Sequence, residues 1–176
     1  TDPILGPEMK STGEVMGTGD TFAAAFARAQ LGAGDDPPTS GLCLISVRDV
    51  DKAAAVEVAR RLVARGFTLA ATGGTAKALT DAGLTVRMVN KVAEGRPHIV
   101  DLIKNDEAAI IINTTEGRRA IMDSASIRAS AEQHNVFYTT TLAAAEAVCM
   151  ALEQETDITV RRLQDLHDSI HESRAV

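Results

Sequence analysis

The chain has 176 residues, a formal net charge of −6, and 45% hydrophobic but only 3% aromatic residues. This length allows one domain with a buried core plus extensions, and no apolar run approaches the about 20 residues that a membrane-spanning helix needs. The acidic balance disfavours nucleic acid as a partner, because proteins that follow a phosphate backbone usually carry a basic surface.

The first 40 residues differ in composition from the rest of the chain. They begin without an initiator Met or a signal-like apolar run, so we expect a piece of a longer protein. A helical pattern covers residues 21–31 and is expected to end at Gly32. Residues 32–40, GAGDDPPTS, disfavour helix and strand because Gly, Asp and paired Pro interrupt both. We therefore predict a linker over residues 32–40 between a segment of residues 1–31 and a domain of residues 41–176.

From residue 41 onward, short apolar runs alternate with helical patterns. The expected strands are residues 42–47, 67–71, 84–89, 108–112 and 136–138. The expected helices and helical turns are residues 49–65, 74–82, 97–104, 124–134 and 141–153. This order predicts an α/β fold with three αβα layers and a five-stranded parallel sheet, because right-handed crossovers place helices on both faces. Residues 158–170 are expected to add a short strand and a terminal helix.

The two cysteines, Cys43 and Cys149, lie in an apolar and an alanine-rich run. Neither belongs to a CxxC motif or to another ligand spacing. We expect buried, reduced thiols in a cytoplasmic protein.

Polar side chains follow each predicted strand at the point where it ends. The sets are Ser46, Arg48 and Lys52; Thr72, Gly73, Gly74 and Thr75; Asn90 and Lys91; Asn113, Thr114 and Thr115; and Thr139, Thr140 and Thr141. The carboxyl ends of parallel strands meet at one edge, where helix N-termini point free N–H groups. A phosphate needs such donors, close backbone approach at glycine, and ammonium groups. The convergence of Lys52 and Lys91 with the TGGT loop predicts an anion site.

Each loop taken alone also has a purely structural explanation. Thr or Ser before a helix is commonly an N-cap, and Gly-Gly is commonly a turn. The Walker pattern GxxxxGK[ST] and the dinucleotide pattern GxGxxG are both absent from the sequence.

Catalytic and metal-binding patterns are weaker than the anion pattern. The acidic candidates near this edge are not spaced with a His or Cys as an activated nucleophile would be; they are Glu94, Asp101, Glu116 and Asp123. His167 and His171 would share a helix face but have no third ligand in spacing. For His98, at a helix start, capping or packing and ligand contact remain equally open. We predict no catalytic residue and no metal site.

Four segments are specific enough to resemble a known family: LISVRDVDK, ATGGTAKAL, VNKVAEGRPHIVDLIKN and IINTTEGRRAIMDS, at residues 44–52, 71–79, 89–105 and 111–124. In this order they resemble the C-terminal regulatory domain of the large subunit of carbamoyl-phosphate synthase. GPEMKSTGEVMG and the helix up to Leu31 are similar to the tail of the preceding synthetic domain, which is of ATP-grasp type. The resemblance covers nearly the whole chain and implies a methylglyoxal-synthase-like fold.

The resemblance also implies a set of effector-binding residues. Bacterial members bind UMP as an inhibitor, and IMP or ornithine as activators or modulators. The nucleotide phosphate would meet Lys52, Thr72, Thr75 and Lys91, with Gly73 and Gly74 allowing close approach; Asn113, Thr115 and Ser124 would face ribose or base; and Ile99 and Ile127 would bracket the base. Tyr138 and Thr140 match positions used toward ornithine. Gly73 replaces a histidine found in some relatives, and the choice between UMP and IMP stays open.

For the parent enzyme, the resemblance implies a cytoplasmic, glutamine-hydrolysing ligase of pyrimidine and arginine biosynthesis. It would use ATP with Mg or Mn and K, and its partners would be the rest of the large subunit and a glutaminase small subunit. This chain lacks most of the ATP-grasp unit, so we expect it to be non-catalytic and without a cofactor.

Two other functions are weighed against regulation. The first is a phosphate-handling lyase of the methylglyoxal synthase type. Such enzymes place aspartates at the positions that match Pro97 and Thr114, and neither residue can act as a general acid or base at neutral pH. The second is a docking or oligomerisation module whose loops are merely capped.

Overall fold

The computed structural model describes residues 15–34, 37–114 and 118–154, together with residues 162, 164, 165 and 167. Thr115 therefore lies outside the described residues. The strand and helix expected over residues 158–170 also lie outside them, apart from those four single positions.

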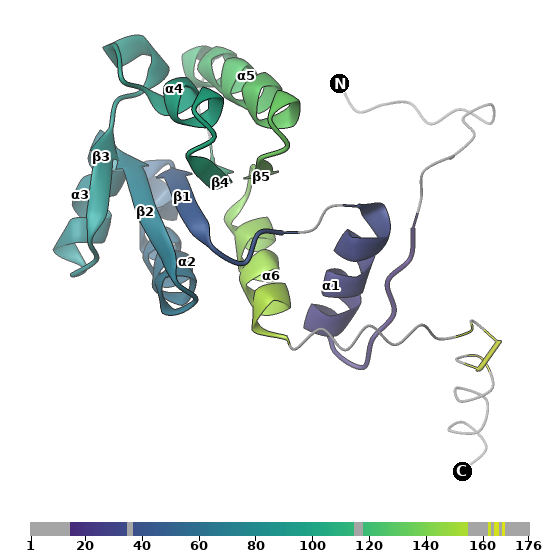
Figure 1. Cartoon of the computed structure of the whole chain (residues 1–176). Helices are drawn as coiled ribbons and strands as arrows, with labels where there is room; N and C mark the ends of the chain where they lie inside the picture. Colours follow the sequence, from purple (N-terminus) through teal and green to yellow (C-terminus); the bar gives the residue numbers. More distant parts are fainter. Residues whose placement is uncertain are drawn as a thin grey trace.

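The described residues form a five-stranded sheet in the order β3-β2-β1-β4-β5, with every pair of neighbours parallel (Figure 1). The strands are β1 (Gly41–Ser46), β2 (Phe67–Thr72), β3 (Val86–Val89), β4 (Ala108–Asn113) and β5 (Phe137–Thr139). The predicted α/β fold with a five-stranded parallel sheet is confirmed. Because β2 and β3 extend the sheet on one side of β1, and β4 and β5 on the other, the strand order reverses between β1 and β4.

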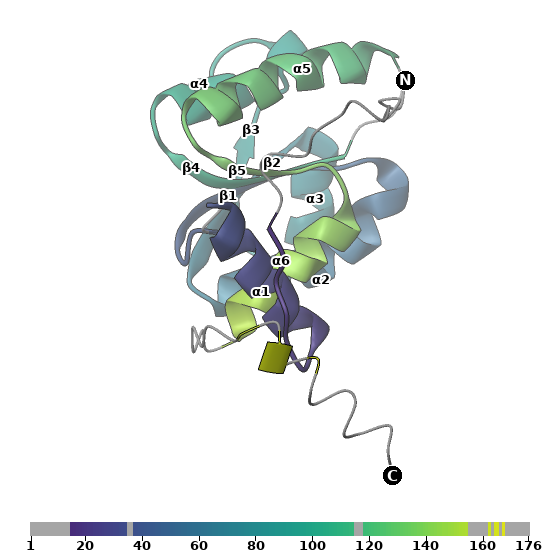
Figure 2. The same ribbon diagram turned by 90° about the vertical axis from the view of Figure 1, so that its right-hand side faces the viewer.

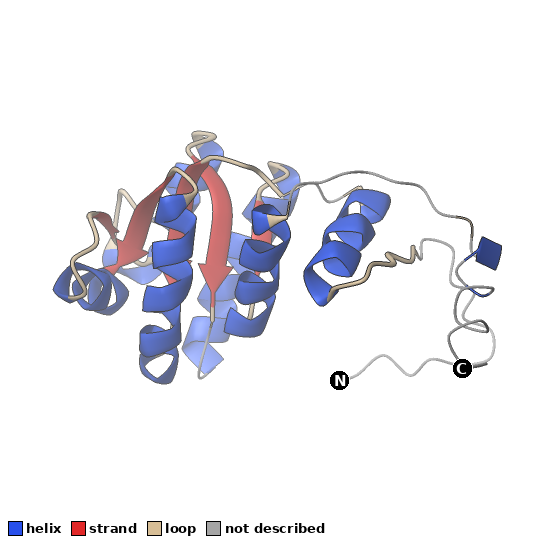
Figure 3. Ribbon diagram, turned by 90° about the horizontal axis from the view of Figure 1, so that it is seen from below, coloured by secondary structure: helices blue, strands red, loops and turns tan. Residues whose placement is uncertain are grey.

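Helices cover both faces of the sheet, as the right-handed crossover of parallel strands requires. One face carries α2 (Lys52–Ala64), α3 (Gly73–Asp81) and α6 (Leu142–Glu153), and the other carries α4 (Ile99–Lys104) and α5 (Arg118–Gln133) (Figures 1 and 2). Two short 3-10 turns, η1 (Asp49–Asp51) and η2 (Val92–Glu94), precede α2 and α4. Seen from below, one layer of helices lies in front of the strands (Figure 3).

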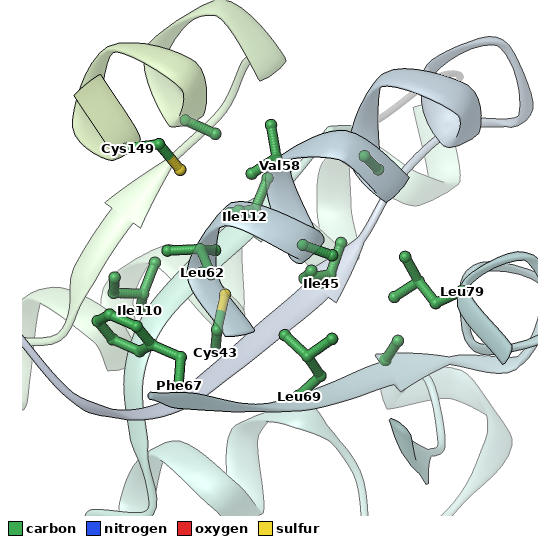
Figure 4. Close-up of a cluster of buried hydrophobic side chains, with 14 of the residues drawn as sticks. Cys43, Ile45, Val58, Leu62, Phe67, Leu69, Leu79, Ile110, Ile112 and Cys149 are labelled. Carbon is green, nitrogen blue, oxygen red and sulfur yellow. The ribbon is translucent and has the colours of Figure 1, made fainter. Parts of the chain in front are cut away.

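Alternation along β1 divides the hydrophobic core between the two faces. Cys43 and Ile45 pack into the cluster beneath α2, α3 and α6 (Figure 4). Leu44 belongs to the cluster beneath α4 and α5. All three side chains are fully buried, which explains why the strand sequence is continuously apolar.

Both cysteines are buried and free, as predicted. Burial raises the pKa of the Cys149 thiol to about 11 and raises that of Cys43 as well. These thiols are therefore protonated at neutral pH, and they behave as small hydrophobic side chains of the core.

Helix α1 (Phe22–Ala33) lies outside the sheet layers and packs beside α6 (Figures 1 and 2). The Thr21 hydroxyl accepts a hydrogen bond from the Ala24 N–H and caps its start. The prediction that this helix ends at Gly32 is wrong. It continues to Ala33 and is closed by Gly34, whose φ of 79° is the left-handed conformation that glycine adopts most easily.

Most other boundaries differ from the sequence prediction by one or two residues, and α5 and the helix after β1 differ by more. Helix α5 begins at Arg118 instead of residue 124. Ser124 is therefore an interior helix residue and not an N-cap. Strand β3 begins at Val86 instead of residue 84, because the Leu84 N–H bonds to the Leu79 carbonyl and closes the end of α3. The helix expected over residues 49–65 begins as the separate turn η1.

We predict that Ile111→Ala lowers the free energy of unfolding by about 2–5 kcal/mol, because it removes a fully buried side chain from the inner strand β4. Urea denaturation measures this loss. The matched control is Met88→Ala on the edge strand β3, where the side chain is 72% exposed; its effect should stay within about 0.5 kcal/mol. Equal losses in the two variants would contradict the assigned core.

Candidate functional site

A cavity of about 300 Å³ lies at the carboxyl ends of the strands, where the strand order reverses between β1 and β4. Ligands of open parallel sheets bind in the crevice at such a switch point. The lining residues come from the loop after β1, the start of α3, the segment after β3, the end of β4, and helices α4 and α5. They are Ser46, Val47, Arg48, Asp49, Lys52, Thr72, Gly74, Thr75, Lys91, Val92, Ile99, Asn113, Thr114, Ser124 and Ile127.

The loop between β1 and α2 is fixed by threonines on both sides. On one side, Thr75 Oγ1 of α3 accepts a hydrogen bond from the Val47 N–H at 3.2 Å. On the other, Thr114 Oγ1 accepts one from the Arg48 N–H at 3.0 Å, and the Thr114 N–H donates to the Ser46 carbonyl at 3.0 Å. These bonds satisfy backbone groups that follow the end of a buried strand, so the loop has a defined position.

Arg48 is held by Asp51 within the same loop. The guanidinium donates to both carboxylate oxygens of Asp51, at 2.7 and 3.1 Å. The pKa of Asp51 is lowered by the hydrogen bond from Arg48, and further by one from the Thr114 hydroxyl. The pair places an arginine at the rim of the cavity in a fixed geometry.

Lys52, the first residue of α2, lies over the start of α3. Its Nζ is 2.7 Å from Asp49 Oδ1, and it would be only 3.0 Å from a Cβ atom placed on Gly74. Glycine at position 74 therefore leaves room for the ammonium group. A Cβ atom on Gly73 would meet no atom within 4 Å, and Gly73 is not among the described lining residues. Of the two glycines predicted to allow close approach to the backbone, only Gly74 lines the described cavity and lies against Lys52.

The N-terminus of α3 opens into this cavity without a side-chain cap. Thr72 is the N-cap residue, yet its hydroxyl lies 3.1 Å from Ser46 Oγ and makes no capping bond to the helix. The first N–H groups of α3 thus have no side-chain acceptor from this residue, and they carry the partial positive charge of the helix dipole.

The described lining is positive overall. Three cationic side chains, Arg48, Lys52 and Lys91, face one acidic side chain, Asp49. Lys91 follows β3 and is exposed, and its backbone N–H donates to Glu94 Oε2 at 2.8 Å. The pKa of Asp49 is lowered by the hydrogen bond and the positive charge of Lys52. This end of the cavity therefore favours an anion.

The opposite wall combines apolar and polar side chains. Ile99 of α4 and Ile127 of α5 contribute apolar surface. Beside them, Asn113 Nδ2 donates to Ser124 Oγ and to Tyr138 OH, both at 2.9 Å, and the two hydroxyl oxygens are 3.1 Å apart.

The cavity brings together most of the residues predicted from the sequence: Lys52, Thr72, Gly74, Thr75, Lys91, Ile99, Asn113, Ser124 and Ile127. Effector binding by these residues stays a prediction. Thr140 is exposed after β5, and Tyr138 borders a second cavity that Gln30 and His134 also line. Sequence reasoning placed Ser46, Arg48 and Thr114 among the polar residues that converge on this edge of the sheet, but did not assign them to effector binding. It missed Val47, Asp49 and Val92, whose positions next to those residues were the available signal.

Two negative findings apply to the described part of the chain. No group of three His, Cys, Asp or Glu side chains there has the arrangement of a metal site. None of the helices in that part is both long enough and apolar enough to cross a membrane.

We predict that Asp51→Asn destabilises the chain at neutral pH, and that the difference from wild type shrinks as the pH falls. The folded-state pKa of Asp51 lies below its unfolded value of about 3.9. The ionised carboxylate therefore stabilises the fold at pH values above the unfolded pKa, and this stabilisation is lost as the pH falls through the folded-state pKa. Urea denaturation at a series of pH values measures this. Glu132→Gln, at an exposed carboxylate on α5, is the control. A pH-independent difference for Asp51→Asn would contradict the prediction.

Comparisons with known proteins bear on the family and the fold of the chain. Residues 54–140 match the family model of the MGS-like domain. The chain is 64% identical over 166 residues to the carbamoyl phosphate synthase large chain of Pseudomonas putida, 63% over 169 residues to that of Pseudomonas aeruginosa, and 52% over 174 residues to that of Vibrio cholerae. These matches cover 94%, 96% and 99% of this chain, but it spans only 16% of the length of each relative.

Among solved structures, the fold is similar to that of methylglyoxal synthase from Elizabethkingia anophelis NUHP1. The TM-score is 0.52 with 20% sequence identity, over 67% of this chain and 80% of that one. At this identity the likeness concerns the fold alone, whereas the curated relatives match in sequence along almost the whole chain. The chain therefore belongs to the MGS-like domain family, in the form found within the large chain of carbamoyl phosphate synthases.

Proposed function

We propose that this chain is the regulatory domain of a carbamoyl phosphate synthase large chain, and that its cavity binds a nucleoside monophosphate, UMP or IMP. The observation that carries the proposal is the meeting of an uncapped helix N-terminus with three cationic side chains at one end of the cavity. The other end offers apolar surface and neutral polar groups. A nucleoside monophosphate matches these two ends, because it joins an anionic phosphate to a largely uncharged nucleoside.

The phosphate would lie at the start of α3. There the N–H groups of the first turn supply donors, and Lys52 and Lys91 supply positive charge. The hydroxyl of Thr75 is already engaged with Val47, at 3.2 Å to its N–H and 3.4 Å to its carbonyl. The phosphate contact thus rests mainly on the cations and the helix start, and Thr75 serves first to position the loop.

The nucleoside would lie toward α4 and α5. Ile99 and Ile127 supply two apolar walls for a flat base, and Asn113 and Ser124 supply polar atoms for ribose or base. Thr115, which the resemblance also assigns to this end, lies outside the described residues.

The charges favour binding over proton transfer. Asp49 is the one carboxylate among the described lining residues, and its lowered pKa makes it a weak proton acceptor at neutral pH. Thr114, at one of the positions where the lyase would need an aspartate, uses its hydroxyl to accept the Arg48 N–H. Pro97 offers no ionisable group.

We therefore rank the lyase of methylglyoxal synthase type second, and we predict no turnover of dihydroxyacetone phosphate. A colorimetric assay for methylglyoxal, with the purified chain at high concentration, tests this. Release of methylglyoxal above that of a heat-denatured sample would reverse the ranking.

The proposal extends to the parent protein, of which the chain spans 16% in the relatives. Residues 1–31 would be the tail of the preceding synthetic domain. The rest of the parent protein would be a glutamine-dependent ligase that uses ATP with Mg or Mn and K. Ornithine would be sensed near Tyr138 and Thr140, and a glutaminase small subunit would be the partner. The setting would be pyrimidine and arginine biosynthesis in the cytoplasm. The sequence identity to the large chains supports this extension.

We predict that Lys91→Ala weakens UMP or IMP binding by about ten- to a hundredfold, since it removes a charge-assisted contact of about 1.5–3 kcal/mol. Titration calorimetry of the whole chain measures the affinity. Lys104→Ala, at an exposed lysine in the last turn of α4, is the charge-matched control and should leave the affinity unchanged.

Two results would count against the proposed function. The first is the absence of heat with both nucleotides while circular dichroism shows a folded chain. The second is an unchanged affinity in Lys91→Ala, which would favour a docking module with capped loops.

A further inference from the structure

Three polar side chains from separate elements meet behind one wall of the cavity. Asn113 ends β4, Ser124 lies within α5, and Tyr138 lies in β5. Asn113 Nδ2 is 2.9 Å from Ser124 Oγ and 2.9 Å from Tyr138 OH, and the two hydroxyl oxygens are 3.1 Å apart. Each of the three groups therefore contacts the other two.

A count of hydrogens fixes the orientation of the Asn113 amide. With Nδ2 toward the hydroxyls, its two N–H groups serve one contact each, and one hydroxyl hydrogen serves the third. With the amide reversed, three oxygen–oxygen contacts would share only two hydroxyl hydrogens. One contact would then be a repulsion between lone pairs, so the reversed orientation is disfavoured.

The orientation decides what the cavity wall offers to a ligand. Asn113 and Ser124 line the cavity, whereas Tyr138 is not among its described lining residues. Both amide hydrogens of Asn113 are used behind the wall, so its carbonyl oxygen, an acceptor, is the atom left for a ligand. When Tyr138 donates to Ser124, the Ser124 hydroxyl hydrogen is left as a donor beside it.

We infer that Tyr138 is a positioning residue that, with Ser124, locks the Asn113 amide, so that the cavity selects a ligand edge carrying a hydrogen-bond donor beside an acceptor. This inference rests on the proposed function and deepens it. A ring N–H beside a carbonyl, as in uracil and hypoxanthine, has this edge, and so do adjacent ribose hydroxyls. In cytosine the ring nitrogen that carries the N–H of uracil is bare, and the donor is the neighbouring amino group. A cytosine ring held in the position of uracil therefore places an acceptor against the Asn113 oxygen, and it matches the wall only if it moves along its edge.

Removing the Tyr138 hydroxyl should release the lock and leave the fold intact. In Tyr138→Phe the ring keeps its packing, including its place beneath the Arg128 guanidinium at 6.0 Å from the ring centroid. The amide would then keep one hydroxyl neighbour, Ser124. It could satisfy that neighbour in either orientation, and the wall would accept the opposite ligand edge.

Titration calorimetry of the full chain with UMP, cytidine monophosphate and 2′-deoxy-UMP tests the inference. Wild type should bind UMP more tightly than at least one of the other two; cytidine monophosphate reports on the base and 2′-deoxy-UMP on the ribose. The ratio of the affinity for UMP to the affinity for the nucleotide that binds more weakly measures this selectivity. In Tyr138→Phe this ratio should fall by about two- to tenfold, the effect of one neutral hydrogen bond. Thr68→Val, which removes an exposed hydroxyl from β2, should leave it unchanged.

Ser124→Ala removes another corner of the cluster and should reduce the same ratio, which keeps the test valid if Tyr138→Phe does not fold. Equal affinity of wild type for all three nucleotides would overturn the inference. So would a variant that weakens all three by one common factor, because a purely structural role predicts that result. Absence of binding by folded wild type would instead overturn the proposed function itself.

Discussion

The site depends on the loop between β1 and α2 being held from both sides. At the switch point, the helices that follow β1 and β4 cover opposite faces of the sheet, and this separation opens the crevice. The loop carries Arg48 and leads into Lys52, so its position sets the positions of both charges. Thr75 and Thr114 accept hydrogen bonds from its backbone N–H groups and thereby fix the position of the loop that carries these cations.

The same bonds limit what the site can do chemically. A hydroxyl that positions a backbone N–H is less available to a ligand, so the threonines serve as supports while the cations and the start of α3 carry the attraction. Asp49 is likewise committed to Lys52. Fixed donors and a lowered carboxylate pKa suit the retention of a phosphate, whereas proton transfer requires a base whose pKa is near neutral.

The polar cluster at Asn113 joins three elements that are separate in the sequence. The Tyr138 hydroxyl contacts Asn113 and Ser124, which line the first cavity, and Tyr138 itself borders the second cavity, as does Gln30 of α1. One aromatic residue thus links the polar cluster of the first cavity to the second cavity. The cluster also explains the placement of Ser124, whose hydroxyl points out of the helix to tertiary partners.

The sequence by itself determined the order and type of the strands and helices, because buried parallel strands and amphipathic helices leave clear periodic patterns. It also determined which loops share an edge, since parallel strands all end on the same side, and its motifs identified the family. Only the tertiary structure decided that α5 begins before Ser124, that Gly34 instead of Gly32 closes α1, and what each hydroxyl binds. Thr75 and Thr114 bond to residues 28 and 66 positions away. Local propensity reads a threonine as a cap, whereas its actual partner is set by which distant backbone group the fold brings within hydrogen-bonding distance.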